Sequence, residues 1–301
     1  MNLSPARSPR PDDVVLMTTS ILVGLFAASF FKKRGVGTAE MATLLLGLLH
    51  WNPHWECFVT NPDCTAAATA ALDQLLSTPG TDFANIVEFE VSNYSPPAPW
   101  KAIGAYQSCG HDWATLFYNT NLWDVVTTDV GCVYDSRSYA AASFKSKAEP
   151  DFSVVIVGAH YPQTLNASTH AYVDANDKLK SVFAKLAVAG GHAIFLADTN
   201  TESPEAAALK PDHHGVNRTQ LQLATDLGIW SGTTEPPAAP LYYGCCYSDG
   251  FDWQGDRVVA NFGTVVESHI LFDPAPSWAN LSATPSEFHK GMRAILQFVK
   301  G

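Results

Sequence analysis

The stretch Ala193-Ile194-Phe195-Leu196-Ala197-Asp198-Thr199-Asn200 decides how the rest of the chain is understood. Its apolar part predicts a buried strand, and the polar end leads into a loop. Asp198 and Asn200 are two residues apart, so they lie on the same side of the pleat at the strand end. A carboxylate there can bind a cation or a water, and a carboxamide can donate hydrogen bonds to an anion. An isolated Asp-x-Asn is more often a simple turn, so the rest of the chain must decide between these interpretations.

The composition indicates a globular protein with a large core. The chain has 301 residues, of which 47% are hydrophobic and 16% charged, and its formal net charge is −11. This length fits one large domain or two small ones. An acidic protein is not attracted to polyanions at long range, so nucleic-acid binding would depend on local patches or bound cations.

The N-terminal part contains an uncharged apolar run at residues 14–31, directly followed by Lys32-Lys33-Arg34. Its length, about 18 residues, is at the lower limit for a membrane span. We expect residues 1–38 to form a segment with a signal anchor or a signal peptide at 14–31, although a buried helix fits the same pattern. The basic cluster would, by the positive-inside rule, leave the following domain in the cytosol.

The cysteines and glycosylation sequons favour the secretory pathway instead. The six cysteines form three groups of neighbours: Cys57 and Cys64, Cys109 and Cys132 on either side of a predicted hairpin, and Cys245 and Cys246. An even number of cysteines suits disulfides. Four sequons, which matter only in a secretory lumen, begin at Asn93, Asn166, Asn217 and Asn280. We therefore expect a membrane-anchored or secreted glycoprotein.

The order of predicted elements is mixed α/β, without a repeat of fixed period. Strands are predicted over 42–52, 81–91, 139–144, 152–159, 193–198, 256–260 and 292–299, and a β-hairpin over 114–126. Helices are predicted over 65–76, 171–189 and 218–227.

Polar residues near the ends of these strands are the candidate site. They are Asn52, Glu88, His160, Asp198, Asn200 and His289. Glu88 alone lies inside a strand-like run, where a carboxylate is costly unless it is paired or binds a metal. Two carboxylates and an Asn suit Mg²⁺, and two histidines suit proton transfer near neutral pH. If the strand ends converge, this set fits hydrolysis of a phosphate ester.

Six short motifs, in order along the chain, resemble those of the endonuclease/exonuclease/phosphatase superfamily, the deoxyribonuclease-I-like fold. They are Trp51-Asn52, Asp82 to Glu88, His160, Ala197-Asp198-Thr199-Asn200, Asp256-Arg257-Val258 and Ser286-Glu287-Phe288-His289. The resemblance implies a domain at 39–301 with a four-layer α/β/β/α sandwich of two packed mixed β-sheets flanked by helices. It also implies a metal-dependent hydrolase that acts on phosphate ester bonds, as a phosphodiesterase or a phosphatase.

The resemblance implies a role for each residue of the candidate metal and base sites. His289 is the general base, and Glu287 orients its imidazole. Glu88, helped by Asn52, holds Mg²⁺, with Mn²⁺ as the other possibility, against a phosphate oxygen. Asp198 positions the attacking water or a second cation.

Two further side chains, Asn200 and His160, are expected to donate hydrogen bonds to the phosphoryl oxygens as charge grows on them. The role of Asp256 stays open between catalysis and a structural ion pair with Arg257 or another base. The substrate is expected to be a phosphate ester, from nucleic acid, a lipid or an inositol phosphate, and the sequence indicates no protein partner.

The chain departs from the family pattern at three positions. Val87 replaces a Gln, Ala197 replaces a Gly, and Phe288 separates the last acidic residue from His289. If Glu287 and His289 lie on a strand, they share a face and the pairing survives. If they do not, the alternative is a catalytically impaired member that acts as a binding module.

Overall fold

The computed structural model describes residues 43–104, 109–110, 112–163, 169–202, 204–205, 216–280 and 287–300. The predicted anchor at 14–31, with the rest of segment 1–38, lies outside this part, as do Ser286 and the sequon at Asn166. None of the helices within these ranges is long and apolar enough to cross a membrane.

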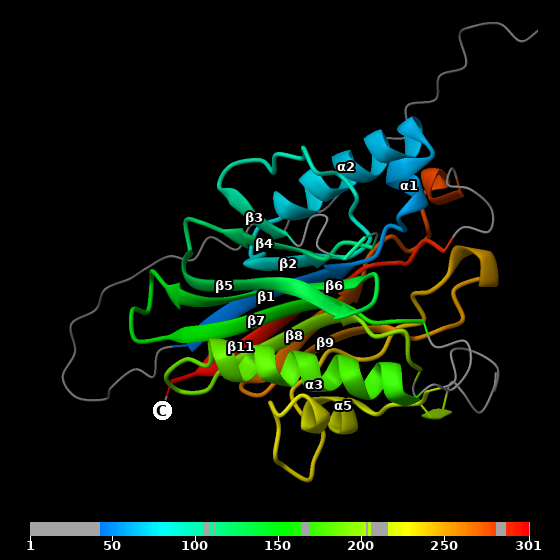
Figure 1. Cartoon of the computed structure of the whole chain (residues 1–301). Coiled ribbons are helices and arrows are strands. Elements are labelled where there is room, and N and C mark those ends of the chain that lie inside the picture. The colour runs from blue at the N-terminus through cyan, green and yellow to red at the C-terminus, as the bar shows by residue number, and fades with distance from the viewer. Residues whose placement is uncertain are drawn as a thin grey trace, which may run out of the picture. The chain divides into compact units, whose positions relative to one another are not determined.

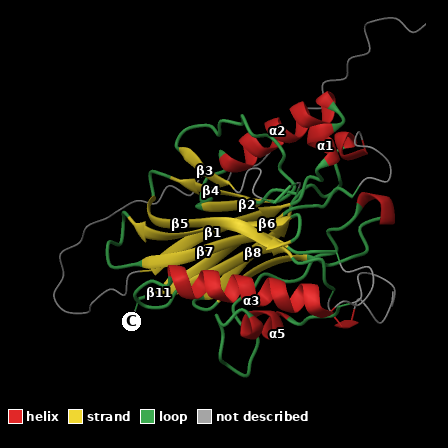
Figure 2. Cartoon of the chain, viewed as in Figure 1, coloured by secondary structure: helices red, strands yellow, loops and turns green. Residues whose placement is uncertain are grey.

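Two β-sheets pack face to face in residues 43–300 (Figures 1 and 2). The first contains β1 (Thr43–Trp51), β2 (Phe83–Ile86), β3 (Trp100–Gly104), β4 (Thr115–Asn119), β10 (Thr264–Ile270) and β11 (Met292–Val299). The second contains β5 (Trp123–Tyr134), β6 (Arg137–Ser146), β7 (Ser153–His160), β8 (Ala193–Asp198) and β9 (Asp256–Ala260). The strand orders are β10-β11-β1-β2-β4-β3 and β5-β6-β7-β8-β9. Both sheets are mixed, since β1–β2 and β7–β8 are parallel pairs.

Helices cover the outer face of each sheet, which confirms the predicted four-layer sandwich (Figure 1). On the first sheet lie α1 (Glu56–Val59) and α2 (Pro62–Leu76), and on the second α3 (Thr169–Leu186) and α5 (Gln220–Asp226). Two 3₁₀ turns, η1 (Tyr247–Asp249) and η2 (Ser277–Asn280), lie in the C-terminal third. Asn61 begins α2, because its side chain accepts from the backbone N–H of Asp63 and Cys64.

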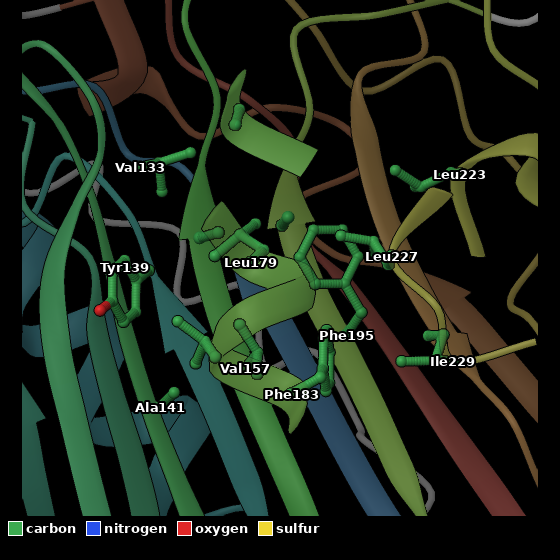
Figure 3. Packing of buried hydrophobic residues seen from close by; sticks show 14 of the residues in the cluster. Val133, Tyr139, Ala141, Val157, Leu179, Phe183, Phe195, Leu223, Leu227 and Ile229 are labelled. Atoms are coloured by element: carbon green, nitrogen blue, oxygen red, sulfur yellow. The ribbon is translucent and has the colours of Figure 1, made fainter. Parts of the chain in front are cut away.

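Each sheet has two buried faces, so the fold contains three apolar layers. Along β1, Leu46 and Leu48 point between the sheets, while Leu49 and Trp51 point outward beneath α2. Phe195 of β8 points outward from the second sheet into the layer under α3 and α5 (Figure 3). Alternation with a period of two therefore assigns each strand residue to one layer.

The layer between the sheets becomes polar at one end. Along β8, the inward-facing residues are Ile194, Leu196 and then Asp198. The register places His160 at the end of β7 beside Asp198, and Asp198 opposite Asp256 at the start of β9. In the other sheet, β11 runs antiparallel to β1. The ends of β1, β2, β7 and β8 and the beginnings of β9 and β11 thus meet at one edge.

Asp82, the first residue of one predicted motif, connects the two sheets and does not belong to this edge. Its Oδ2 accepts the backbone N–H of Gly47 at 2.7 Å, and its Oδ1 accepts Nε1–H of Trp123 at 2.8 Å. Burial raises its pKa to about 6. Asp82 is therefore a structural residue.

Two local predictions were wrong. The segment 114–126 is not a hairpin, since β4 belongs to the first sheet and β5 to the second, so the turn between them crosses from one sheet to the other. The hairpin is β5–β6. Glu88 is not inside a strand, because β2 ends at Ile86, and Glu88 follows with φ of 56°. Glu88 therefore also lies at a strand end.

The structure joins the six cysteines in three disulfides, a pairing that the sequence left open. Cys57–Cys64 and Cys109–Cys132 have Cα–Cα distances of 5.1 and 5.4 Å, and Cys245 is joined to Cys246.

Candidate active site

Glu88 is a buried carboxylate held by donors from the loop after β1. Its Oε1 accepts from Nδ2 of Asn52 at 3.1 Å. Its Oε2 accepts the backbone N–H of Trp55 at 2.8 Å and lies 3.2 Å from Nδ1 of His54. Burial opposes ionisation, but the hydrogen bond from His54 and the positive charge of Arg137 bring the pKa of Glu88 well below its usual range. The side chain is therefore an anion.

Asn52 connects Glu88 to the other sheet. Its Nδ2 also donates to Oδ2 of Asp198 at 3.0 Å. His160 lies against the same two acids, with Nε2 at 3.4 Å from Oε1 of Glu88 and 3.5 Å from Oδ2 of Asp198. Four of the predicted site residues, which are far apart in sequence, thus meet across the two sheets.

Arg137 is a site residue that the sequence reasoning missed. It begins β6, and its Nη1 lies 2.9 Å from Nε2 of His160, 3.0 Å from Oδ2 of Asp112 and 3.7 Å from Oε1 of Glu88. Burial and the charge of Arg137 lower the pKa of His160 well below its usual value, so this imidazole is neutral. The only sequence signal was an Arg directly before an apolar strand.

His289 lies on the other side of Asp198, paired with Asp256. Its Nδ1 lies 2.9 Å from Oδ2 of Asp256 and 3.8 Å from Oδ2 of Asp198, and its Nε2 lies 3.8 Å from Sγ of Cys246. Burial lowers the pKa of His289, but the charges of Asp256 and Asp198 outweigh it and raise the pKa to about 9. The second oxygen of Asp256, Oδ1, lies 2.9 Å from Nε2 of His50.

The carboxylate that orients His289 is therefore Asp256 and not Glu287, which corrects our expectation. Residues 287–290 are not a strand, so the rule that places residues i and i+2 on one face does not apply. Phe288 packs on Trp51 and Trp278, and the charge of Glu287 acts on His54. The local pattern could not show this, because the partner of His289 comes from another strand.

The structure does not pair the carboxylate of Asp256 with Arg257; the bases beside this carboxylate are His50 and His289. The guanidinium of Arg257 donates to the backbone carbonyl groups of Gln254 and Thr201, on the side of β9 that faces away from the inter-sheet layer. The side chains of Asp256 and Arg257 point to opposite faces of the strand, so the carboxylate of Asp256 contacts His50 and His289 instead.

Asn200 forms the turn that an isolated Asp-x-Asn predicts. Its backbone N–H donates to Oδ1 of Asp198 at 2.9 Å, with φ of 47°. Its Nδ2 donates to the carbonyl oxygen of Tyr161 at 2.7 Å. Turn and site are therefore compatible, because the same residue fixes Asp198 and joins the ends of β7 and β8.

Three groups of ligand atoms in the described residues lie close enough together to hold a divalent cation. In one of them, Cys245 and Cys246 with His289, the two sulfurs are joined in a disulfide and are not available as thiolates. Two groups remain. One consists of Glu88, Asp112 and His160, and the other of Asp198, Asp256 and His289. Within each group the ligand atoms lie within 4.8 Å of one another. Carboxylate oxygens with imidazole nitrogen suit Mn²⁺, and the carboxylates alone suit Mg²⁺. The residues present thus fit a divalent cation.

Solved structures with the same architecture are endonuclease/exonuclease/phosphatase proteins. The chain has their fold. The endonuclease/exonuclease/phosphatase from Bacteroides vulgatus has a TM-score of 0.57 at 13% identity, over 85% of this chain and 100% of that one. The mannosyl-6-phosphatase of Bacteroides thetaiotaomicron has a TM-score of 0.54 at 13% identity, over 83% and 98%.

A third similar structure is ANGEL2, a 2′,3′-cyclic phosphatase, in complex with adenosine-2′,3′-vanadate. Its TM-score is 0.56 at 8% identity, over 87% of this chain and 99% of that one. No model of a protein family matches the sequence, and no curated protein matches it. The predicted superfamily fold is confirmed, and at these identities the comparison extends to the fold alone.

Proposed function

We propose that the protein is a metal-dependent phosphoesterase in which a water activated by His289 attacks phosphorus in line with the leaving oxygen. The observation that carries the proposal is the pair His289–Asp256, with 2.9 Å between Nδ1 and Oδ2, at the same edge as Glu88 and Asn52. Proteins with the same fold include a mannosyl-6-phosphatase and a 2′,3′-cyclic phosphatase, which supports a phosphate ester as substrate.

In this proposal Asp256 sets the tautomer of His289. Once the imidazole is neutral, an Nδ1–H donated to Asp256 leaves Nε2 as the nitrogen that takes the proton from water. Because the pKa of His289 is about 9 without a bound cation, its basic form increases as the pH rises. The rate is therefore expected to increase from pH 7 toward pH 9.

Glu88 would hold the divalent cation, and Asn52 would keep Glu88 and Asp198 at their present separation through its two hydrogen bonds. When bound, Mg²⁺ or Mn²⁺ supplies a positive charge that neutralises and orients a phosphate oxygen. Asp198, whose pKa is raised by burial, is placed to accept a hydrogen bond from the attacking water.

Arg137 and His160 would stabilise the negative charge that grows on the phosphoryl oxygens. The neutral His160 serves as a hydrogen-bond donor, and the guanidinium of Arg137, with a side chain that is 15% exposed, serves as a fixed cation at the edge of the site. Asn200 has one N–H of Nδ2 that is not used by Tyr161, and this N–H can join them.

We favour a small or membrane-borne phosphate ester over nucleic acid as the substrate. The formal net charge of −11 opposes a polyanion. A signal anchor or signal peptide at 14–31 would bring the site to a membrane surface or a secretory compartment, and lipid or inositol phosphates would then be within reach.

A binding module without turnover is the second candidate. The observation that favours it is Phe288, which is buried among Trp51, Phe272 and Trp278 at the position before His289. An acidic side chain at that position is what the superfamily resemblance leads us to expect, so the cation site has one carboxylate fewer than expected.

The test is hydrolysis of bis-p-nitrophenyl phosphate and p-nitrophenyl phosphate by the full chain, with Mg²⁺, Mn²⁺ or EDTA. We expect metal-dependent release of p-nitrophenol that falls roughly 10²- to 10⁴-fold in His289→Ala. The matched control is His269→Ala, since His269 is an exposed histidine on β10 that also pairs with an acid. Unchanged turnover in His289→Ala would contradict the proposed base, and no turnover with no cation binding would favour the binding module.

A further inference from the structure

Each carboxylate oxygen of Asp256 has a histidine partner, and the proposed mechanism uses only one of these two contacts. His289 approaches Oδ2, while His50 of β1 approaches Oδ1 at 2.9 Å. Behind His50 lies Asn85 of β2, with its Nδ2 at 3.2 Å from Nδ1 of His50 and 2.8 Å from the carbonyl oxygen of Leu196. A row of polar groups therefore crosses from β8 through the first sheet and back to β9.

The hydrogen-bond directions in this row follow from its far end. The carbonyl oxygen of Leu196 only accepts, so the amide group that faces it must be the nitrogen of Asn85. The second N–H of that nitrogen then donates to Nδ1 of His50. An imidazole that accepts at Nδ1 carries its proton on Nε2, which donates to Asp256. Asp256 thus accepts an N–H on each oxygen.

The surroundings of His50 and Asn85 are apolar, so burying these two polar side chains costs desolvation free energy. His50 and Asn85 are both 0% exposed and lie on inward faces beside Leu48 and Phe83, where apolar side chains would avoid any desolvation of polar groups. On the facing strand β7, a Cβ at Gly158 would lie 2.1 Å from Oδ1 of Asn85. A glycine therefore leaves the space that Asn85 occupies.

We propose that Asn85 and His50 are positioning residues for the general base, which act through Asp256. Asn85 fixes the tautomer of His50, and His50 holds the carboxylate of Asp256 in the plane that receives Nδ1–H of His289. The inference rests on the proposed function, because it assigns the pair a part in holding the proposed base. Neither residue touches the reacting atoms.

Two amide substitutions at position 50 separate positioning from packing. In His50→Gln the amide reaches further from the backbone, toward Oδ1 of Asp256, whereas in His50→Asn it ends near Asn85 and leaves Oδ1 without its donor. The control is His192→Gln, because His192 is a half-buried histidine at the opposite end of β8, where its ring stacks on Phe152. Thermal unfolding of each variant establishes that it is folded.

The first measurement is the steady-state kinetics of bis-p-nitrophenyl phosphate hydrolysis. We expect kcat of His50→Asn to fall roughly 10- to 100-fold with KM nearly unchanged, the size expected for one hydrogen bond to a charged group. His50→Gln should recover most of this loss, and His192→Gln should have the kcat of the wild type. Equal losses in His50→Gln and His50→Asn would overturn the proposal, since packing alone would then explain them.

The second measurement does not require turnover. At a pH above the pKa of about 9, where the ring is neutral, the ¹⁵N chemical shifts of His289 show which ring nitrogen carries the proton. We expect them to change in His50→Asn but not in His50→Gln. If the wild type hydrolyses no phosphate ester, the proposed function fails and these shifts alone decide the inference. Identical His289 shifts in the wild type and His50→Asn would overturn it.

Discussion

The two buried histidines of the site differ in charge at neutral pH, although both lie close to carboxylates. His160 has Glu88 at 3.4 Å, and His289 has Asp256 at 2.9 Å. Beside His160 lies the guanidinium of Arg137, and burial and this charge lower the pKa of His160 well below its usual value. Around His289 the closest charges are carboxylates, which raise its pKa to about 9 against the effect of burial.

This difference in charge suits the part of the site around His160 and the part around His289 to different tasks. A neutral ring next to a fixed cation has one N–H to donate and takes up no proton near neutral pH, so the part of the site around His160 suits the binding of phosphoryl oxygens. A ring held by anions binds a proton firmly and releases it as the pH rises toward its pKa of about 9, so the part of the site around His289 suits acid–base chemistry. The charge of the neighbour, and not the depth of burial, separates the roles.

Removing the anion beside His289 should have the largest effect. In Asp256→Asn we expect kcat/KM for bis-p-nitrophenyl phosphate to fall roughly 10³-fold, because the imidazole loses its orienting charge and its preferred tautomer. Asp249→Asn, at an exposed carboxylate of η1, is the control. A loss below tenfold would mean that another group orients His289.

The raised pKa of His289 predicts a pH-dependent stability for the metal-free protein. The folded-state pKa of about 9 is above the usual histidine pKa of 6.5, so folding takes up a proton between these pH values. The stabilisation, about 3 kcal/mol, is complete below pH 6.5 and is lost as the pH rises through 9. Urea unfolding in EDTA should therefore give a smaller decrease over this range for His289→Gln than for the wild type. Equal decreases would show that the ring is neutral throughout.

Removing the positive charge of Arg137 beside His160 should reduce kcat/KM less than removing the charge of Asp256. In Arg137→Gln the pKa of His160 should rise toward its usual value, and kcat/KM should fall roughly 10- to 100-fold, as for loss of a charged hydrogen-bond donor. Arg218→Gln, at an ion pair with Asp226 on the far side of α3, is the control. NMR titration of His160 checks the first result, and an unshifted pKa would refute our explanation of its neutrality.

The smallest effect is expected from a substitution at Gly158, which lies against Asn85 behind His50 and Asp256. Gly158→Ala should lower the free energy of unfolding by about 1 to 2 kcal/mol, because the new Cβ displaces Asn85. Combined with Asn85→Ala, the same substitution should cost less than it does alone, since the clashing side chain is gone. Chemical denaturation of the four proteins measures this coupling, and strictly additive losses would contradict the contact.

Much of the fold was predictable because it depends on local patterns. Apolar runs and their polar ends predicted β1, β7, β8 and β9, and the ordered motifs predicted the sandwich. The hairpin at 114–126 was wrong, because a turn sequence predicts a reversal of the chain and not the sheet that the next strand joins.

The candidate site was predictable only where each residue follows its own strand. Asn52, Glu88, Asp198 and His160 meet as the motif order implied. His50 carried no signal, because it looks like one more residue of an apolar strand and its partner is 206 positions away. We inferred a contact between Glu287 and His289 because these residues are close in sequence. In the structure Asp256, which is distant in sequence, makes the contact with His289.

The pairing of β1 with β11 has a consequence for biosynthesis. Thr43 lies opposite Val299, and β11 lies between β1 and β10, so one of the two neighbours of the earliest described strand is made after all the other described strands. A ribosome makes the acidic residues Glu88 and Asp198 of the site well before it makes His289. Until β11 pairs with β1, a nascent chain would have the acidic residues of the site without the pairing that fixes His289 beside them.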